Sequence, residues 1–182
     1  MSQQFRKKSP VRSVVKHRAD YRAYKDELAQ DFDHCCGYTA CRDVWFGGQH
    51  TFQIDHLKPW TKYPELKTEY RNLVYCCSYV NRAKWDDDSP NYLDPCDVDY
   101  NAHFERDGNG IIVGKSPEAL YMVQKMHLNL TRYALIWTLD RLDDIISRLK
   151  AHRKAHPEIE GLLTALQDNY FDYVQDLHNN HQ

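Results

Sequence analysis

Four residues in the middle of the sequence combine ligands for a hard metal ion with an acid–base group. Asp55 is followed directly by His56, and Asn72 and Asn81 come later in the chain. Carboxylate and amide oxygens suit Mg²⁺, which keeps several waters and uses few protein ligands. An imidazole with an ordinary pKa of about 6.5 can deprotonate a water molecule at neutral pH. These residue types therefore predict a metal-assisted hydrolytic site, of the kind that can cleave a phosphodiester bond.

The elements around these residues are predicted to bring them together. Residues 51–56 alternate as a strand does, and residues 73–76 form a second strand. The connection between them contains two prolines and is therefore expected to be irregular. A short helix begins near Tyr79 and ends before Pro90. If the two strands fold back as a hairpin, Asp55, His56 and Asn81 can converge on one point. Lys84, one helical turn beyond Asn81, can share that face and touch a phosphate.

The order and spacing of these residues resemble the HNH endonuclease family, in the variant whose first metal ligand is Asp and whose last is Asn. The resemblance rests on three segments: Asp55-His56, Asn72-Leu73 and Asn81-Arg82-Ala83-Lys84. It implies a ββα-metal finger in which Asp55 and Asn81 bind catalytic Mg²⁺ or Mn²⁺. By the same resemblance His56 is the general base, and Asn72 holds the loop and orients His56. We expect Lys84 to assist catalysis, and we expect nucleic acid to be bound by Lys58, Arg82 and Lys84.

The resemblance extends over roughly residues 31 to 145. The segments KYPELKTEYRNLVYC and YLDPCDVDYNAHFERDGNGIIV are similar to stretches of stand-alone bacterial HNH proteins that often occur beside an ATPase in Septu-like phage-defence systems. This implies a nuclease effector subunit that acts on nucleic acid, DNA ahead of RNA, with an ATPase as its protein partner. The alternative is a catalytically silent nucleic-acid-binding or scaffold subunit that has kept the finger shape.

The cysteines depart from the family pattern. Related HNH proteins often carry two Cys-x2-Cys knuckles that bind a structural Zn²⁺, but Thr39 and Val80 stand where the second sulfur of each knuckle would be. Tetrahedral zinc needs four ligands. We expect that the zinc site is lost; the alternative is a site rebuilt from Cys36, Cys41 and Cys77 with one further ligand, which would be Cys35, Cys76, Cys96 or His34.

Composition and charge describe a folded protein with an uneven charge distribution. The 182 residues are 42% hydrophobic and 27% charged, with a net charge of −2. We find no apolar segment long enough to span a bilayer, so we expect a cytoplasmic protein that does not bind membranes. Residues 1–25 contain eight Lys and Arg but one acidic residue. Residues 1–19 are predicted to be a mobile basic arm, which either contacts phosphates or is a solvated tail that only aids solubility.

We expect an α+β fold in which the HNH finger is embedded in a mainly helical chain. Its three parts are the arm at 1–19, a nuclease core at 20–116 that begins with a helix near residues 20–31, and a C-terminal antiparallel helical region at 117–182. That region is predicted to start with one long amphipathic helix, because leucines recur every seven residues, and a second helix follows His156-Pro157. The apolar faces could pack on each other or bind the partner. The repeated leucines are Leu128, Leu135, Leu142 and Leu149.

Overall fold

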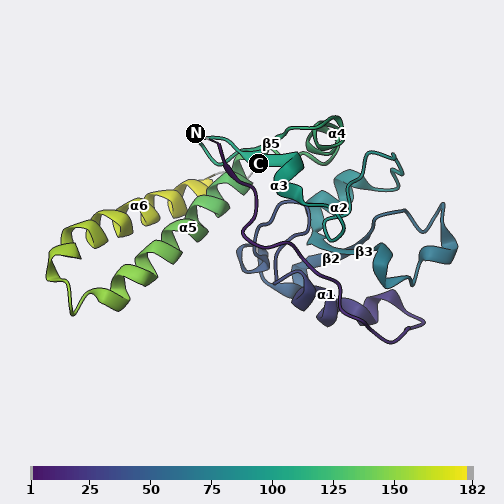
Figure 1. Cartoon of the computed structure of the whole chain (residues 1–182), viewed down its shortest axis with the longest axis horizontal. Coiled ribbons are helices and arrows are strands. Elements are labelled where there is room, and N and C mark those ends of the chain that lie inside the picture. Colours follow the sequence, from purple (N-terminus) through teal and green to yellow (C-terminus); the bar gives the residue numbers. More distant parts are fainter. Residues whose placement is uncertain (1, 180–182) are drawn as a thin grey trace. The chain divides into compact units, whose positions relative to one another are not determined.

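The computed structural model describes residues 2–179 and shows an α+β protein with small antiparallel sheets (Figure 1). The chain divides into two compact units, one that ends at Asn129 and one that begins at Leu130. Within residues 2–179, no helix has the length and apolar character needed to cross a membrane. The sequence-based prediction of an α+β fold is therefore confirmed.

A two-stranded hairpin followed by a helix forms the centre of the first unit. Strand β2 (Phe52–His56) pairs antiparallel with β3 (Leu73–Cys77), and α2 (Ser78–Lys84) starts immediately after β3. All five residues of β3 are buried, so this strand is part of the core. The predicted order of strand, irregular connection, strand and short helix is present.

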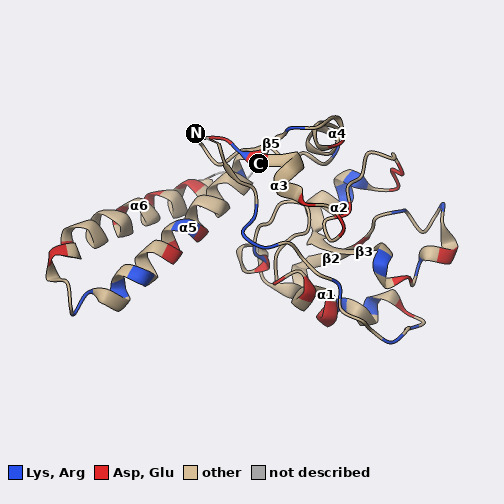
Figure 2. Cartoon of the chain, in the orientation of Figure 1, with Lys and Arg blue, Asp and Glu red and all other residues tan. Residues whose placement is uncertain are grey.

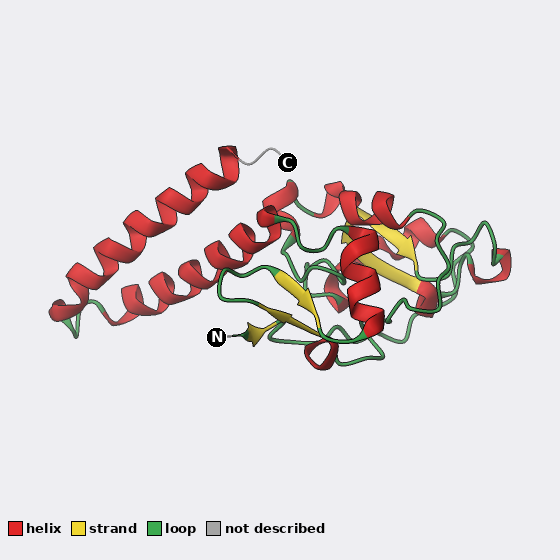
Figure 3. Cartoon of the chain, turned by 90° about the horizontal axis from the view of Figure 1, so that it is seen from above, coloured by secondary structure: helices red, strands yellow, loops and turns green. Residues whose placement is uncertain are grey.

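A second sheet lies beside α4 in the same unit (Figure 3). Its strand order is β1 (Gln3–Gln4), β4 (Phe104–Arg106), β5 (Ile112–Gly114), with all neighbours antiparallel. Helix α4 (Pro117–Met126) packs on β5 and also contacts α2. Strand β5 and helix α4 approach each other closely at Gly114, where a Cβ atom would lie 2.7 Å from the backbone of α4.

The remaining elements of the chain are short. The predicted first helix is present, as a 3-10 turn that continues into α1. The other elements are 3-10 turns and the one-turn helix α3. Their bounds are η1 (Tyr21–Tyr24), α1 (Lys25–Asp31), η2 (Asp43–Phe46), η3 (Gln49–Thr51), η4 (Pro64–Leu66), η5 (Tyr70–Asn72), α3 (Tyr100–His103) and η6 (Pro157–Ile159).

Residues 2–19 are not a mobile arm, which corrects the prediction made for this segment; Met1 lies outside the described residues. Phe5 is 1% exposed and packs against the rings of Tyr100 and Phe104. Arg6 is buried and donates to the carbonyl of Gly37, and Arg12 forms an ion pair with Asp94. The prediction failed because it counted basic residues without asking which of them lie next to buried aromatic residues. Several other lysines and arginines of the segment are exposed on its extended path (Figure 2).

The C-terminal unit is a pair of packed helices, but the long helix predicted from residue 117 is wrong. Helix α4 ends at Met126, His127 has a left-handed φ of 51°, and α5 (Thr131–His152) begins four residues later. Leu128 therefore lies in the connection, fully buried within the first unit, and does not continue the seam of α5. Helix α6 (Glu160–Asn179) packs against α5. The second compact unit begins at Leu130, whereas the helical region was expected to begin at residue 117.

Candidate active site

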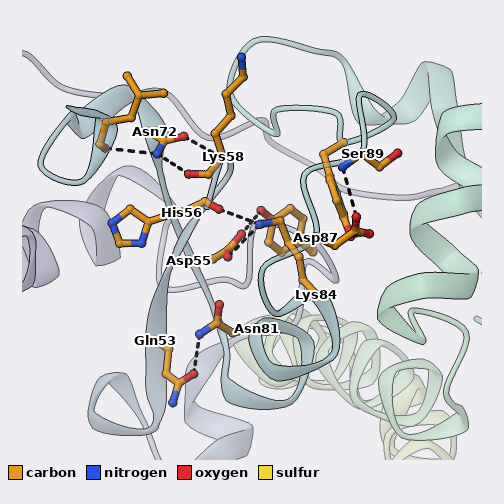
Figure 4. Close-up of polar contacts among 12 residues, drawn as sticks. Gln53, Asp55, His56, Lys58, Asn72, Asn81, Lys84, Asp87 and Ser89 are labelled. Atoms are coloured by element: carbon orange, nitrogen blue, oxygen red, sulfur yellow. Dashed lines mark hydrogen bonds and ion pairs between the residues drawn. The ribbon is translucent and has the colours of Figure 1, made fainter. Parts of the chain in front are cut away.

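Strand alternation divides the polar residues of the hairpin between its two faces. Successive side chains of a strand point to opposite sides, so Gln53 and Asp55 share one face and His56 belongs to the other. The first face is covered by α2, whose Asn81 and Lys84 contact these two residues. On the other face, the ring of His56 packs edge-on against Tyr21 of η1, with 4.7 Å between the ring centroids. Figure 4 shows Asp55 and His56 directed to opposite sides.

Asp55 is held in a buried polar network. Its side chain is 3% exposed, and its Oδ1 accepts a hydrogen bond of 3.2 Å from Nζ of Lys84. Its Oδ2 accepts one of 2.6 Å from the hydroxyl of Tyr38. Burial raises the pKa of the Asp55 carboxyl, and the positive charge of Lys84 and the hydrogen bond from Tyr38 act in the opposite direction. The carboxylate is therefore stabilised in its charged form by these two partners.

Lys84 is not a surface phosphate contact, which corrects the role expected for it. Its side chain is fully buried, and Nζ also donates a 2.7 Å hydrogen bond to the backbone carbonyl of His56. A lysine can enter an interior when oxygen atoms replace its hydration shell. The helical turn after Asn81 was correctly expected to face the site, but the sequence did not show that Lys84 would point inward to Asp55.

Asn81 lies on the same face and is partly exposed. Its amide nitrogen donates a 2.7 Å hydrogen bond to Oε1 of Gln53. In the view of Figure 4 its amide oxygen is turned toward the side of Asp55. The two expected metal ligands thus belong to neighbouring elements on one face of the hairpin.

His56 is oriented by a backbone carbonyl. Its Nε2 lies 2.9 Å from the carbonyl oxygen of Lys67. A carbonyl can only accept, so Nε2 carries the proton in the neutral ring and Nδ1 carries a lone pair. Burial lowers the pKa of His56 below its ordinary value of 6.5, while the bond to Lys67 and the charge of Asp55 oppose this. The ring is therefore neutral at pH 7, with Nδ1 as its basic atom.

Asn72 closes the connection between the two strands. Its Oδ1 accepts from the backbone amide of Lys58 at 2.8 Å, and its Nδ2 donates to the Lys58 carbonyl at 2.9 Å. The same nitrogen donates to the carbonyl of Leu66 at 3.3 Å. Leu66 precedes Lys67, whose carbonyl holds His56. Asn72 is thus a positioning residue that acts on His56 through the loop and does not touch its ring in any contact that the structure records.

The three cysteines considered for zinc are all buried, and two of them are neighbours. Cys36 and Cys77 share a hydrogen bond, which lowers the pKa of the Cys36 thiol against the effect of burial and raises that of Cys77. Thr39 contributes a hydrogen bond to Cys36, and Val80 contributes one from its backbone to Cys77. Cys41 joins the turn through its carbonyl, which accepts from the amide of Cys36. Thr39 and Val80 are fully buried where the missing sulfurs would be.

The two other residues expected to bind nucleic acid, Lys58 and Arg82, are exposed. Lys58 follows the hairpin strand that carries His56, and its Nζ lies 5.3 Å from the ring centroid of Tyr63. Arg82 is on α2 next to Asn81. Both charged groups are therefore accessible to solvent.

The oxygen atoms on the α2 face suit a hard cation. Oδ1 of Asp55 and the carbonyl oxygen of His56 already bind one positive charge, the ammonium of Lys84. Together with the Asn81 amide, this donor set has the chemistry of a Mg²⁺ site that keeps several waters. Within residues 2–179, no three His, Cys, Asp or Glu side chains are grouped closely enough to bind a metal, so any metal here would use the single carboxylate of Asp55. Its binding would compete with Lys84.

The sequence did not identify three residues that build this site. Gln53 could have been found, because it lies two residues before Asp55 on a strand and must share its face. Tyr21 and Tyr38 carried no signal of this kind, since each lies in a separate segment whose position depends on the tertiary fold. Compared with protein-family models, curated proteins and solved structures, the chain matches none of them.

Proposed function

We propose that this protein is a metal-dependent endonuclease of the HNH type that hydrolyses phosphodiester bonds in nucleic acid. One observation carries the proposal: His56, fixed through Nε2, directly follows Asp55 in β2, and the Asp55 carboxylate binds the Lys84 ammonium on the opposite face of the hairpin. The ββα arrangement and the position of Asn81 on the same face as Asp55 support it. Hydrolysis of a phosphodiester requires a base and a site for a cation, and the end of β2 carries both, one on each face of the hairpin.

The chain's own residues have separate tasks in this mechanism. Nδ1 of His56 accepts a proton from the attacking water, because Nε2 is already committed to Lys67. Asn72 keeps the loop and therefore the imidazole in position. A divalent metal held by Asp55 and Asn81 would stabilise the negative charge on the phosphate and the leaving oxygen. Such a metal would share the carboxylate with Lys84, which donates to its Oδ1. Contacts of Lys58 and Arg82 with phosphates, and a preference for DNA, remain predictions, as does an ATPase partner.

Cleavage of a supercoiled plasmid tests the role of His56 as the general base. With Mg²⁺ or Mn²⁺ the purified chain should nick or linearise DNA, and His56→Ala should lower the rate by about 10²- to 10⁴-fold. His50→Ala is the matched control, because His50 is an exposed histidine of the same unit and should cut at the unaltered rate. Equal rates in His56→Ala and the unaltered protein would contradict the proposal.

The metal ligands are tested through Asn81. Asn81→Ala should cut slowly at low Mg²⁺ and recover part of its rate when the metal concentration is raised, because it acts through metal affinity. Gln53→Ala removes the hydrogen-bond partner of Asn81 but leaves the amide oxygen, so its metal dependence should change much less. A silent binding or scaffold subunit would bind nucleic acid without cutting under any of these conditions.

A further inference from the structure

The connection between β2 and β3 exposes a tryptophan on an ordered loop. Trp60 is 42% exposed, although a large aromatic side chain is usually buried. The turn that presents it is closed by two backbone hydrogen bonds, from the amides of Lys62 and Tyr63 to the carbonyl of Pro59. These bonds hold the backbone in a conformation that leaves the indole at the surface. Its exposed face is available to a ligand.

One basic side chain packs on this indole, and others lie on the same loop. Nζ of Lys67 lies 4.5 Å from its ring centroid, and Lys58 and Arg71 are exposed on the same loop. Residues 57–72 carry four Lys or Arg against two Glu, so the loop has a net charge of +2. Alternation of an exposed aromatic ring with ammonium groups is the pattern by which proteins stack on bases while they contact the phosphates between them.

The same loop holds the candidate base. The backbone carbonyl of Lys67 accepts from His56, and both backbone groups of Lys58 are bound by Asn72. A ligand that binds the side chains of Trp60 and Lys67 is therefore held at a fixed position relative to the imidazole.

We infer that residues 57–72 form a stacking loop for unpaired bases, in which Trp60 stacks on a base and Lys58 and Lys67 contact its flanking phosphates. The inference rests on the proposed nuclease function and names its substrate class: a single-stranded or locally unpaired stretch of nucleic acid, in preference to an intact duplex. Bases in a duplex are stacked on each other and offer no free face to an indole, whereas bases in a single strand do.

Binding without cleavage tests this inference. Fluorescence anisotropy is measured without divalent metal, using a short single-stranded DNA, an RNA of the same sequence and the matching DNA duplex. The single strands should bind more tightly than the duplex, and Trp60→Ala should weaken single-strand binding by roughly 5- to 150-fold, the loss of one stacked base. Trp60→Tyr should keep most of the affinity, because a phenol ring can still stack.

Two further variants separate the contacts. Lys67→Gln keeps the backbone carbonyl that holds His56 but removes one charge, so it should reduce the slope of log affinity against log salt by about one. Trp85→Ala is the matched control: Trp85 is 74% exposed but is followed by the acidic run Asp86–Asp88, and its loss should leave binding within about twofold, because that run repels phosphates.

The outcomes distinguish this inference from the nuclease proposal. Tight duplex binding equal to that of single strands, an unaffected Trp60→Ala, or an equal loss in Trp85→Ala would overturn the stacking loop even if the protein cuts DNA. Binding that depends on Trp60 in a protein that cuts nothing with Mg²⁺ or Mn²⁺ would confirm the loop and defeat the nuclease proposal. The comparison of the DNA and RNA single strands then decides which source of unpaired bases is preferred.

Discussion

The two faces of the β2–β3 hairpin hold their polar side chains in different ways. On the α2 face, Asp55 is enclosed and its charge is balanced by Lys84 across 3.2 Å. On the opposite face, His56 is held by a backbone carbonyl of a surface loop and by the edge of a tyrosine ring. Asp55 and His56 are adjacent in the sequence, but different parts of the structure hold their side chains. The first face should control stability, and the second should control the position and protonation of the base.

The largest effect is expected on the α2 face. Lys84→Met leaves the carboxylate of Asp55 buried without its cation, which should lower the free energy of unfolding by about 3–5 kcal/mol. The unfolding midpoint in urea measures this. Arg82→Met, two residues earlier and exposed, should change stability by less than about 0.5 kcal/mol.

A second substitution sharpens this test. Combining Lys84→Met with Asp55→Asn removes both charges and should restore a large part of the lost stability, since the penalty comes from the unpaired charge. If Lys84→Met alone were as stable as the unaltered protein, Asp55 would not be a charged partner in the interior.

The opposite face is tested at Asn72. Asn72→Ala removes three hydrogen bonds to backbone groups of the loop, and we expect a loss of about 2–3 kcal/mol. Asn72→Asp keeps the acceptor for the Lys58 amide but sets a carboxylate oxygen against the carbonyls of Lys58 and Leu66, so its loss of stability should be similar or larger, and any cleavage should fall in both. Cleavage that stayed unchanged while stability fell would show that the loop does not position His56.

Protonation of His56 gives a smaller and reversible effect. Burial lowers its pKa below 6.5, and the neutral ring is the active form. The cleavage rate should therefore rise with pH through that lowered pKa and be flat near neutrality. Tyr21→Ala uncovers the ring, so the midpoint of the pH–rate profile should move up toward 6.5. A midpoint that moved down, or did not move, would contradict the role given to burial.

The smallest effect concerns the cysteines where β3 meets α2. The unaltered protein should contain little or no stoichiometric zinc, because Thr39 and Val80 stand where sulfurs are expected. Replacing both by Cys adds two thiols beside the Cys36–Cys77 pair and should create a four-sulfur site that binds one zinc per chain. Elemental analysis of both proteins decides it, and tightly bound zinc in the unaltered chain would favour the rebuilt site through Cys41.

The hairpin could be predicted from sequence because its signals are local. Alternation marked β2, and the spacing of Asn81 and Lys84 placed both on one side of α2. The depth of Lys84 could not be predicted, since a lysine one turn from the site has the same pattern whether it faces solvent or a buried carboxylate. The leucine spacing from Leu128 onward also misled, because a heptad count does not register that His127 leaves the helix. The position of a helix end of this kind depends on tertiary packing.

The pairing of β1 with β4 has a consequence for how the protein is made. Arg6 bonds to Asn101 across a sequence separation of 95 residues, and the aromatic partners of Phe5 come from the same late segment. At roughly 5–20 residues per second, the ribosome needs about 5–20 seconds to translate that separation. During this interval Phe5 lacks its aromatic partners, and the preceding strand β1 is unpaired. The N-terminal segment, although it is translated first, therefore cannot dock until residues 100–106 have been made.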